Sequence, residues 1–315
     1  MYPKELSVGA HLVRSKYPGL RSGMIVPGNN LKHLEKASKA NLDLLHIELE
    51  DGINDDKKQE ARECTLHALQ NFDMSGKITM PRINNVHSGY VEADIDVVAA
   101  GRPTAFLLAK CGGPEDIHYI DLLITQAERK YGIPEGTIKI ASMIERARGL
   151  LKVDEIAVAS ERMMALYIGP TDLSTEVGYR RTYKDNEYET LWPRSRVVFA
   201  AHAANLLAID SPTTYYTDLP LTLQQAKCSY HLGFDLKTCV SPRQIEMVNK
   251  GFTPSDEEIS WAQKVFEGKE EAEAKGLSVW VRDGMMIDEA MVSRAQHILA
   301  TAEKAKRDVL FADKS

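Results

Sequence analysis

The chain has 315 residues, 43% of them hydrophobic, and a formal net charge of -6. This suits one large domain of about 250 residues with an appendage. The basic runs are short and are followed by acidic residues, so the sequence does not indicate a nucleic-acid surface. No apolar stretch is long enough to span a bilayer. The four cysteines form no C-x-x-C pair, and residues 1–16 hold no apolar core of signal-peptide length. We therefore expect a cytoplasmic protein with reduced thiols.

Short apolar segments recur along the first 250 residues. Eight are candidate strands, at residues 24–26, 42–49, 77–83, 104–109, 139–144, 163–168, 206–209 and 233–240. Amphipathic helical patterns separate most of them, for example at residues 30–40, 56–70, 115–131 and 146–159. Strand and helix repeated eight times predict a (β/α)8 TIM barrel over residues 1–250. An open doubly wound sheet is the alternative, although no G-x-G-x-x-G follows any of the strands.

The alternation stops near Lys250, and residues 251–315 form a C-terminal extension. Ser255, with Glu258 three positions later, predicts an N-capped helix to about residue 275. A β-like piece at 278–282, a turn at Gly284 and a final helix at 289–306 follow. This tail is too polar to bury much by itself, so we expect it to pack on the barrel or on another subunit. Residues 178–193, with several charges and three tyrosines, predict a surface loop or lid.

Charged and polar residues follow the predicted strands, where TIM barrels carry their chemistry. In chain order they are Glu50, Asp51, Arg82, Asn84, Lys110, Glu145, Asp172 and Asp210. Glu145 and Asp172, on adjacent strand ends, can share one Mg2+, or they are helix caps or rim salt bridges. Arg82 and Lys110 can stabilise an oxyanion, or they pair with the acids that end the second strand.

The second strand carries two polar residues in its interior. Glu48 lies between Ile47 and Leu49, and a buried glutamate needs a partner, which supports an arginine or lysine inside the barrel mouth. His46 is expected to be a barrel-wall histidine with satisfied hydrogen bonds. The nine histidines form no metal-ligand cluster, and the sequence has no nucleophile elbow, P-loop or zinc motif.

Several short blocks occur in a fixed order over residues 20–305. They are Arg21-Ser22-Gly23-Met24-Ile25-Val26-Pro27-Gly28, Glu48-Leu49-Glu50-Asp51-Gly52, Arg82-Ile83-Asn84, Ala109-Lys110, Ile144-Glu145-Arg146-Ala147-Arg148-Gly149, Gly169-Pro170-Thr171-Asp172-Leu173, Phe252-Thr253-Pro254-Ser255 and Gly284-Met285-Met286-Ile287-Asp288. The series resembles the citrate lyase β-subunit-like family of the HpcH/HpaI aldolase superfamily, which includes malyl-CoA and citramalyl-CoA lyases. The chain departs from that pattern at Glu48, where Asp is usual, and at Arg146, where a small Thr is usual. Val240-Ser241-Pro242 replaces the usual I-H-P.

The resemblance implies a carbon–carbon lyase that depends on Mg2+ or Mn2+. Its substrate would be a 3-hydroxy-3-carboxyacyl-CoA such as citramalyl-, malyl- or citryl-CoA, cleaved to acetyl-CoA and an oxo acid or formed from them. The resemblance implies that Glu145 and Asp172 hold the metal. It also implies that Arg82 stabilises an enolate, that Glu50 orients Arg82, and that Asp288 exchanges the acetyl proton. The residues implied to bind the substrate are Arg21, Pro27, Gly28 and Lys110. Residues 251–315 would cap the barrel mouth of a neighbouring subunit in a homotrimer or hexamer.

Two other functions stay open at this point. One is an oxo-acid aldolase that needs no CoA, although simple pyruvate aldolases of this superfamily lack the Gly284–Asp288 block. The other is the β subunit of a multi-subunit citrate lyase complex with an acyl-carrier partner. A non-catalytic scaffold is disfavoured by the acids at the strand ends. For Asp288 alone, the simpler alternative is that it caps the final helix.

Overall fold

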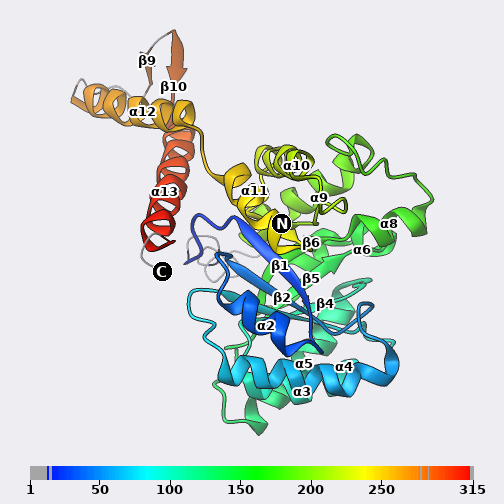
Figure 1. The fold of residues 1–315 in the computed structure, drawn as a ribbon. Helices are drawn as coiled ribbons and strands as arrows, with labels where there is room; N and C mark the ends of the chain where they lie inside the picture. Colours follow the sequence, from blue (N-terminus) through cyan, green and yellow to red (C-terminus); the bar gives the residue numbers. More distant parts are fainter. Residues whose placement is uncertain (1–12, 14–15, 275, 277–278, 283, 313–315) are drawn as a thin grey trace.

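Eight parallel strands close into a barrel in the computed structural model, which describes residue 13 and residues 16–274, 276, 279–282 and 284–312. The strands are β1 (Ser22–Pro27), β2 (Leu44–Glu48), β3 (Ile78–Ile83), β4 (Ala105–Leu108), β5 (Lys139–Ile144), β6 (Met163–Ile168), β7 (Leu207–Asp210) and β8 (Leu236–Cys239). Each strand pairs with the next, and β8 pairs with β1 (Figure 1). The predicted (β/α)8 barrel is therefore confirmed, and the open sheet is wrong.

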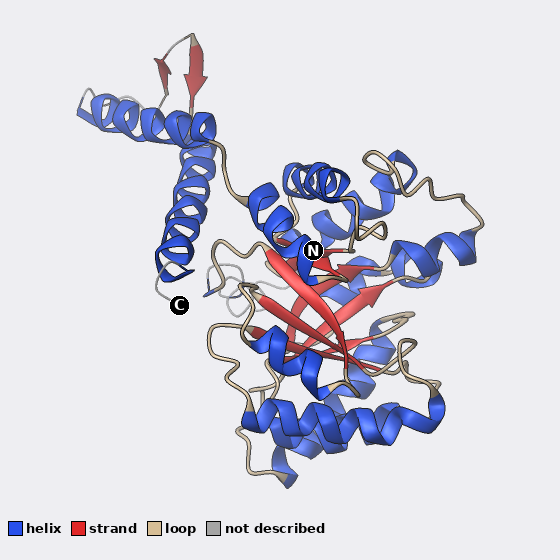
Figure 2. Ribbon diagram, in the orientation of Figure 1, coloured by secondary structure: helices blue, strands red, loops and turns tan. Residues whose placement is uncertain are grey.

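Helices cover the outside of the barrel (Figure 2). They are α2 (Leu31–Ser38), α3 (Lys58–Asn71), α4 (Val91–Val98), α5 (Pro114–Lys130), α6 (Ala147–Leu151), α7 (Val153–Ala157), α8 (Pro170–Val177), α9 (Leu191–Ala203), α10 (Leu219–Leu232) and α11 (Pro242–Phe252). Four of them have proline at the first or second position, where the missing N–H costs no helical hydrogen bond. The helix predicted at 146–159 is broken at Lys152 into α6 and α7.

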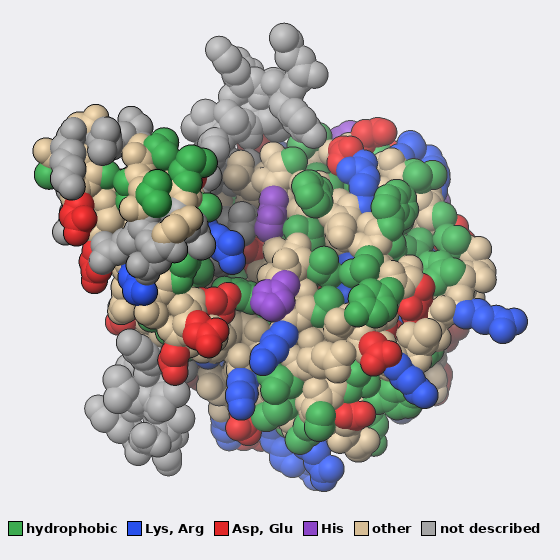
Figure 3. Space-filling view, turned by 90° about the horizontal axis from the view of Figure 1, so that it is seen from above, with side chains coloured by type: hydrophobic (Ala, Val, Ile, Leu, Met, Phe, Trp, Pro, Cys, Tyr) green, Lys and Arg blue, Asp and Glu red, His purple; other side chains and the backbone are tan. Residues whose placement is uncertain are grey.

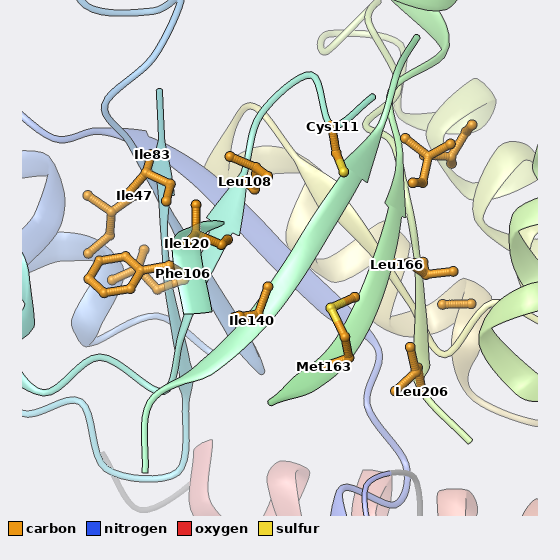
Figure 4. Close-up of a cluster of buried hydrophobic side chains, with 14 of the residues drawn as sticks. Ile47, Ile83, Phe106, Leu108, Cys111, Ile120, Ile140, Met163, Leu166 and Leu206 are labelled. Carbon is orange, nitrogen blue, oxygen red and sulfur yellow. The ribbon is translucent and has the colours of Figure 1, made fainter. Parts of the chain in front are cut away.

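Alternate residues of the strands face two different cores. One core fills the barrel and includes Leu44, Met80 and Tyr167. The other lies between strands and helices, where Ile83 and Phe106 of the wall meet Ile120 of α5 (Figure 4). Because side chains alternate along a strand, polar residues at the even positions of β2 and β3 also point into the barrel.

The predicted loop at residues 178–193 is only partly irregular. A 3-10 helix, η3 (Tyr188–Thr190), leads directly into α9, so the last residues of that segment are helical. The four cysteines are free. Within the described residues no helix is long and apolar enough to cross a membrane. On the face in Figure 3, basic and acidic side chains are interspersed with hydrophobic ones.

The C-terminal extension has a small core of its own. It consists of α12 (Asp256–Ala274), the antiparallel pair β9 (Trp280–Arg282) and β10 (Met285–Ile287), and α13 (Glu289–Ala312). The peptide N–H of Ser255 donates to Glu258 Oε2, and the peptide N–H of Glu258 donates to Ser255 Oγ. These two hydrogen bonds confirm the predicted cap. The structure adds β10, because Gly284 at φ 79° turns the chain back on β9. Ser278, the predicted start of the β-like piece, lies outside the described residues.

The extension projects away from the barrel, and α13 returns toward the chain that precedes β1 (Figure 1). Residues of α13, among them Gln296 and Thr301, line a pocket of about 460 Å³ with Tyr17, Leu20 and Phe252. These partners lie at the amino-terminal end of the barrel. One face of the hairpin stands in solvent, with Val281 72% and Met286 63% exposed, whereas Trp280 and Ile287 pack into the small core of the extension.

Replacement of Gly149 by alanine tests how tightly α6 seats on the barrel. A Cβ at this position would press directly on the carbonyl oxygen of Cys111, which is backbone and cannot rotate away. We expect Gly149→Ala to destabilise the protein by about 1–3 kcal/mol, seen as a lower thermal midpoint. Leu151→Ala in the same helix is the control, because Leu151 is exposed and should change stability by less than about 0.5 kcal/mol. A wild-type midpoint for Gly149→Ala would contradict the close approach.

Candidate active site

The carboxyl ends of β2 and β3 bring a buried acid and a buried base together. Glu48 and Arg82 are direct partners in the strand register, and both point into the barrel. Glu48 Oε2 lies 2.6 Å from Arg82 Nε, in an ion pair of which both members are largely shielded from water. Burial opposes the charged form of Glu48, but Arg82 and His46 outweigh it and lower the pKa of Glu48 to about 2. The predicted basic partner of Glu48 is thus confirmed.

Lys110 joins the same cluster from the end of β4. Its Nζ donates to Glu50 Oε1 at 2.7 Å and to Asp51 Oδ2 at 2.6 Å. Glu50 Oε2 also lies 3.5 Å from Arg82 Nη2, so Glu50 stands between the two cations. Burial raises the pKa of Glu50, although Arg82 and Lys110 oppose this shift. The alternative in which Arg82 and Lys110 pair with the acids of β2 is confirmed.

Glu145 and Asp172 come together as the sequence predicts, at the ends of β5 and β6. Glu145 is 2% exposed, and its Oε1 accepts a hydrogen bond of 2.8 Å from the peptide N–H of Lys110. Burial raises the pKa of Glu145 well above its usual range; Arg82 opposes this shift and Asp172 adds to it. Gly169 leaves room for Glu145, because a Cβ there would lie 2.6 Å from Glu145 Cβ.

Two adjoining carboxylates repel each other when both are charged, and a divalent ion bound between them would relieve that repulsion. Within the described residues no group of three or more His, Cys, Asp or Glu side chains is arranged to hold a metal. A pair of acids nevertheless fits Mg2+, which commonly takes one or two carboxylates and fills its other positions with water or substrate oxygens. Glu145 and Asp172 are therefore the residues that can hold such an ion.

Lys58 and Asp94, which the strand-end argument missed, join the predicted strand-end residue Asn84 in fixing the backbone beneath Glu50. Lys58 on α3 donates all three of its protons, to Leu49 O, Glu50 O and Asn84 Oδ1, at 2.8–2.9 Å. Asn84 is held in turn by Asp94, which accepts from both its peptide and its side-chain amide. For Lys58, the signal in the sequence is the pair Lys57-Lys58, which follows the block Glu48-Leu49-Glu50-Asp51-Gly52.

The residues predicted to bind substrate are divided between the two ends of the barrel. Pro27 is exposed at the rim, and Gly28 is buried beside β2, where a Cβ would lie 2.8 Å from Glu48 O. Arg21 precedes β1 at the opposite end, and its peptide N–H donates to Asp43 Oδ2. The structure therefore brings Pro27, Gly28 and Lys110 close to the acids, and does not bring Arg21 there.

Three further residues lie apart from the acidic cluster. Arg146, which replaces a small residue of the family pattern, pairs with Glu176 on α8 at 2.7 Å and so turns away from the barrel axis. Asp288 lies on the extension, where its Oδ1 accepts from Met291 N at 3.0 Å and caps α13. Asp210 of β7 belongs to a buried network outside the barrel, paired with Arg194 at 2.6 Å and with Lys237 at 3.2 Å.

Known proteins of similar sequence are named as lyases. A family model described as HpcH/HpaI aldolase/citrate lyase matches residues 21–242. The citrate lyase subunit beta of Leuconostoc mesenteroides subsp. cremoris is 34% identical over 90% of this chain and 93% of its own length. The mitochondrial citramalyl-CoA lyase of Rattus norvegicus is 30% identical over 94% of this chain and 89% of its own.

The fold is also that of solved structures. The protein CitE of Mycobacterium tuberculosis, in complex with magnesium, acetoacetate and coenzyme A, matches with a TM-score of 0.75 and 24% identity, covering 91% of this chain and 99% of its own. A citrate lyase from Burkholderia xenovorans LB400 matches with a TM-score of 0.77 and 18% identity, covering 91% and 92%. The family model and the Leuconostoc relative each span most of the chain, so the protein belongs to the HpcH/HpaI aldolase/citrate lyase family and is a carbon–carbon lyase.

Proposed function

We propose that this lyase cleaves, or forms, a 3-hydroxy-3-carboxyacyl-CoA such as citramalyl-, malyl- or citryl-CoA, with acetyl-CoA and an oxo acid as the other partners. One observation carries the proposal: Glu145, which adjoins Asp172, lies within the electrostatic reach of Arg82 at one barrel mouth. Such a mouth offers a place for a chelating oxo acid beside a cation for an enolate. The relatives named as malyl-CoA and citramalyl-CoA lyases support this substrate class.

Mg2+ or Mn2+ would be held by Glu145 and Asp172, and when bound it supplies Lewis-acid polarisation of the oxo-acid oxygens. Cleavage breaks the bond between the methylene and hydroxyl-bearing carbons, and the electron pair of that bond becomes the thioester enolate. The hydroxyl proton passes to a general base at the mouth, for which the carboxylate of a neighbouring subunit's Asp288 is our candidate. Arg82 points its guanidinium at this mouth and stabilises the negative oxygen of the enolate. Glu50 positions Arg82 and Lys110 from the side, and Pro27, Gly28 and Lys110 line the entrance for the thioester.

The enolate carbon then needs a proton. We propose that Asp288 of a neighbouring subunit, in a homotrimer or hexamer, donates it. Within one chain Asp288 caps α13, far along an extension whose other end lies below the barrel. The exposed Val281 and Met286 beside it are apolar surface that a second subunit would cover. Residues 251–315 would thus cap the neighbour's barrel mouth, and a carboxyl group there acts as a general acid or base. Arg21 precedes β1, at the other end of the strand from this mouth, and its contact with the substrate stays a prediction.

A second function is favoured by the 34% identical relative, which is named as a subunit of citrate lyase. In that case the same chemistry would act on an acyl group delivered by an acyl-carrier partner rather than on free CoA thioesters. Incubation of the purified chain with citramalyl-, malyl- and citryl-CoA separates the two. Release of acetyl-CoA and an oxo acid, followed by mass spectrometry, supports the free-thioester lyase. No turnover of any thioester, with activity restored by an acyl-carrier protein, supports the subunit function.

Removal of the metal or of either carboxylate ligand should abolish turnover. We expect activity to disappear after exhaustive chelation and to return with Mg2+ or Mn2+. Glu145→Gln and Asp172→Asn should be inactive with the circular dichroism spectrum of the folded protein, because each change removes one charged oxygen ligand. Leu151→Ala, a change at an exposed position, is the control, because it should pass through the same purification and chelation with wild-type activity. Full activity after complete chelation would contradict the metal requirement.

Replacement of Arg82 by lysine should lower the rate much more than it weakens substrate binding. Lysine keeps the charge but loses the planar set of donors, and loss of one oxyanion donor costs about 3 kcal/mol, or roughly 100-fold in turnover. Steady-state kinetics should show this as a fall in kcat with KM nearly unchanged. A wild-type kcat for Arg82→Lys would remove Arg82 from the reaction.

Mixing two inactive variants tests whether the site is shared between subunits. If Asp288 acts at a neighbour's mouth, Asp288→Asn and Glu145→Gln proteins mixed under subunit exchange should regain part of the wild-type activity. Some mixed sites then combine an intact Glu145 with an intact Asp288. Each variant exchanged with itself is the control. A mixture that stays inactive despite exchange, measured by mass spectrometry of labelled subunits, means that Asp288 does not complete the neighbour's site.

A further inference from the structure

Glu48 has no part in the proposed reaction, yet it makes the shortest contact with Arg82. Glu48 Oε2 lies 2.6 Å from Arg82 Nε, whereas Glu50 Oε2 lies 3.5 Å from Arg82 Nη2. With the acid at Nε, the terminal nitrogens reach other, longer contacts: Nη1 donates to Met143 Sδ at 3.4 Å, and Nη2 faces Glu50. Contact at Nε is therefore the closest restraint on the direction of the guanidinium.

The Glu48 side chain is itself held from three directions. Its Oε1 accepts a hydrogen bond of 2.5 Å from the peptide N–H of Glu50. Gly52 lies directly against its stem, since a Cβ on Gly52 would come within 2.8 Å of Glu48 Cγ. His46 lies deeper in the barrel, with Nε2 3.4 Å from Glu48 Oε2. A carboxylate restrained in this way offers Arg82 a fixed anchor.

His46 is an unusual neighbour for such an anchor. It is 1% exposed, and within the described part of the chain neither ring nitrogen has an aligned hydrogen-bond partner, so the expected satisfied wall histidine is wrong. The ring packs edge-on against Tyr167 at 5.7 Å, and Tyr167 Oη is fixed by Thr238 Oγ1 at 2.5 Å. Buried polar groups without a partner are rare in proteins and call for an explanation. Contact with Glu48 provides one.

We propose that Glu48 is the positioning residue that fixes the direction of the Arg82 guanidinium, and that His46 holds Glu48 against Arg82 from inside the barrel. This inference rests on the proposed role of Arg82 in turnover. It assigns different functions to the two acids: Glu48 anchors Arg82, whereas Glu50 chiefly holds Lys110. It also gives a use to the glutamate at position 48, where the family pattern has aspartate, and to the buried His46 below it.

The test compares Glu48→Gln with Glu128→Gln. Glu128 is also fully buried and also pairs with an arginine, Arg162, at 2.7 Å, but it lies on α5 outside the barrel. With the thioester that the wild type cleaves, Glu48→Gln should lower kcat about 100-fold while KM and the half-saturating Mg2+ concentration change less than about threefold. Glu128→Gln should lose thermal stability but keep kcat within about twofold. His46→Leu should lower kcat about tenfold.

Several results would overturn the inference. A wild-type kcat for Glu48→Gln would do so, and so would an equal loss of kcat in Glu128→Gln, which would indicate a general effect of destabilisation. If Glu48→Gln does not fold, Glu48→Asp replaces it, because aspartate keeps the charge but withdraws the carboxylate from Arg82 Nε by one methylene; unchanged kcat there also overturns the inference. A wild-type kcat for His46→Leu would remove His46 from the arrangement.

A measurement without substrate separates this inference from the proposed function. The Arg82 Nε–H resonance, identified by its disappearance in Arg82→Lys, should shift in Glu48→Gln and His46→Leu and stay in place in Glu128→Gln. That shift, found with a wild type that cleaves no thioester, would keep the positioning arrangement and reject the substrate class. An unshifted resonance in Glu48→Gln would reject the positioning arrangement whatever the substrate.

Discussion

Arg82 carries its charge into the barrel, where bulk water cannot solvate it, and the acids of β2 replace that solvation. A lone buried guanidinium would be very costly, so Glu48 and Glu50 are as much a condition of the fold as of the chemistry. Their charges raise the pKa of Arg82 despite its burial, which keeps the cation permanently charged. The same cation acts on Glu145 across the mouth and opposes the rise in its pKa. Anchoring one arginine thus determines the electrostatic state of both halves of the site.

The acids need a rigid backbone as well as a cation, and the layer behind the strands supplies it. Lys58 holds the carbonyls of Leu49 and Glu50 from α3, and Asn84 ties that lysine to β3 and to Asp94 on α4. This polar cluster lies where a barrel usually has aliphatic packing. It uses buried charge to keep the turn after β2 in a single conformation, and full pairing makes such a network rigid.

Much of the molecule follows from the sequence because its signals are local or periodic. Eight apolar segments predicted the strands, and the strand-end positions predicted the meeting of Glu145 and Asp172, since parallel strands share one carboxyl edge. Other features depend on distances that spacing does not encode. Which of Glu48 and Glu50 would contact Arg82 more closely depends on side-chain direction, and the outward turn of Arg146 depends on Glu176 one helix away. The position of Arg21 is a similar case, because its block spans the whole of β1 and the two ends of the block lie at opposite ends of the barrel.

Lys110 shows what this construction means for motion. Its backbone is in the left-handed region at φ 51°, which aims the peptide N–H at Glu145 while the side chain reaches back to Glu50 and Asp51. One residue therefore ties the acids of β2 to those of β5 and β6, through its main chain on one side and its ammonium group on the other. These contacts restrain the strand ends that form the floor of the mouth. We therefore expect closure around a substrate to involve the segments above the strand ends rather than the floor.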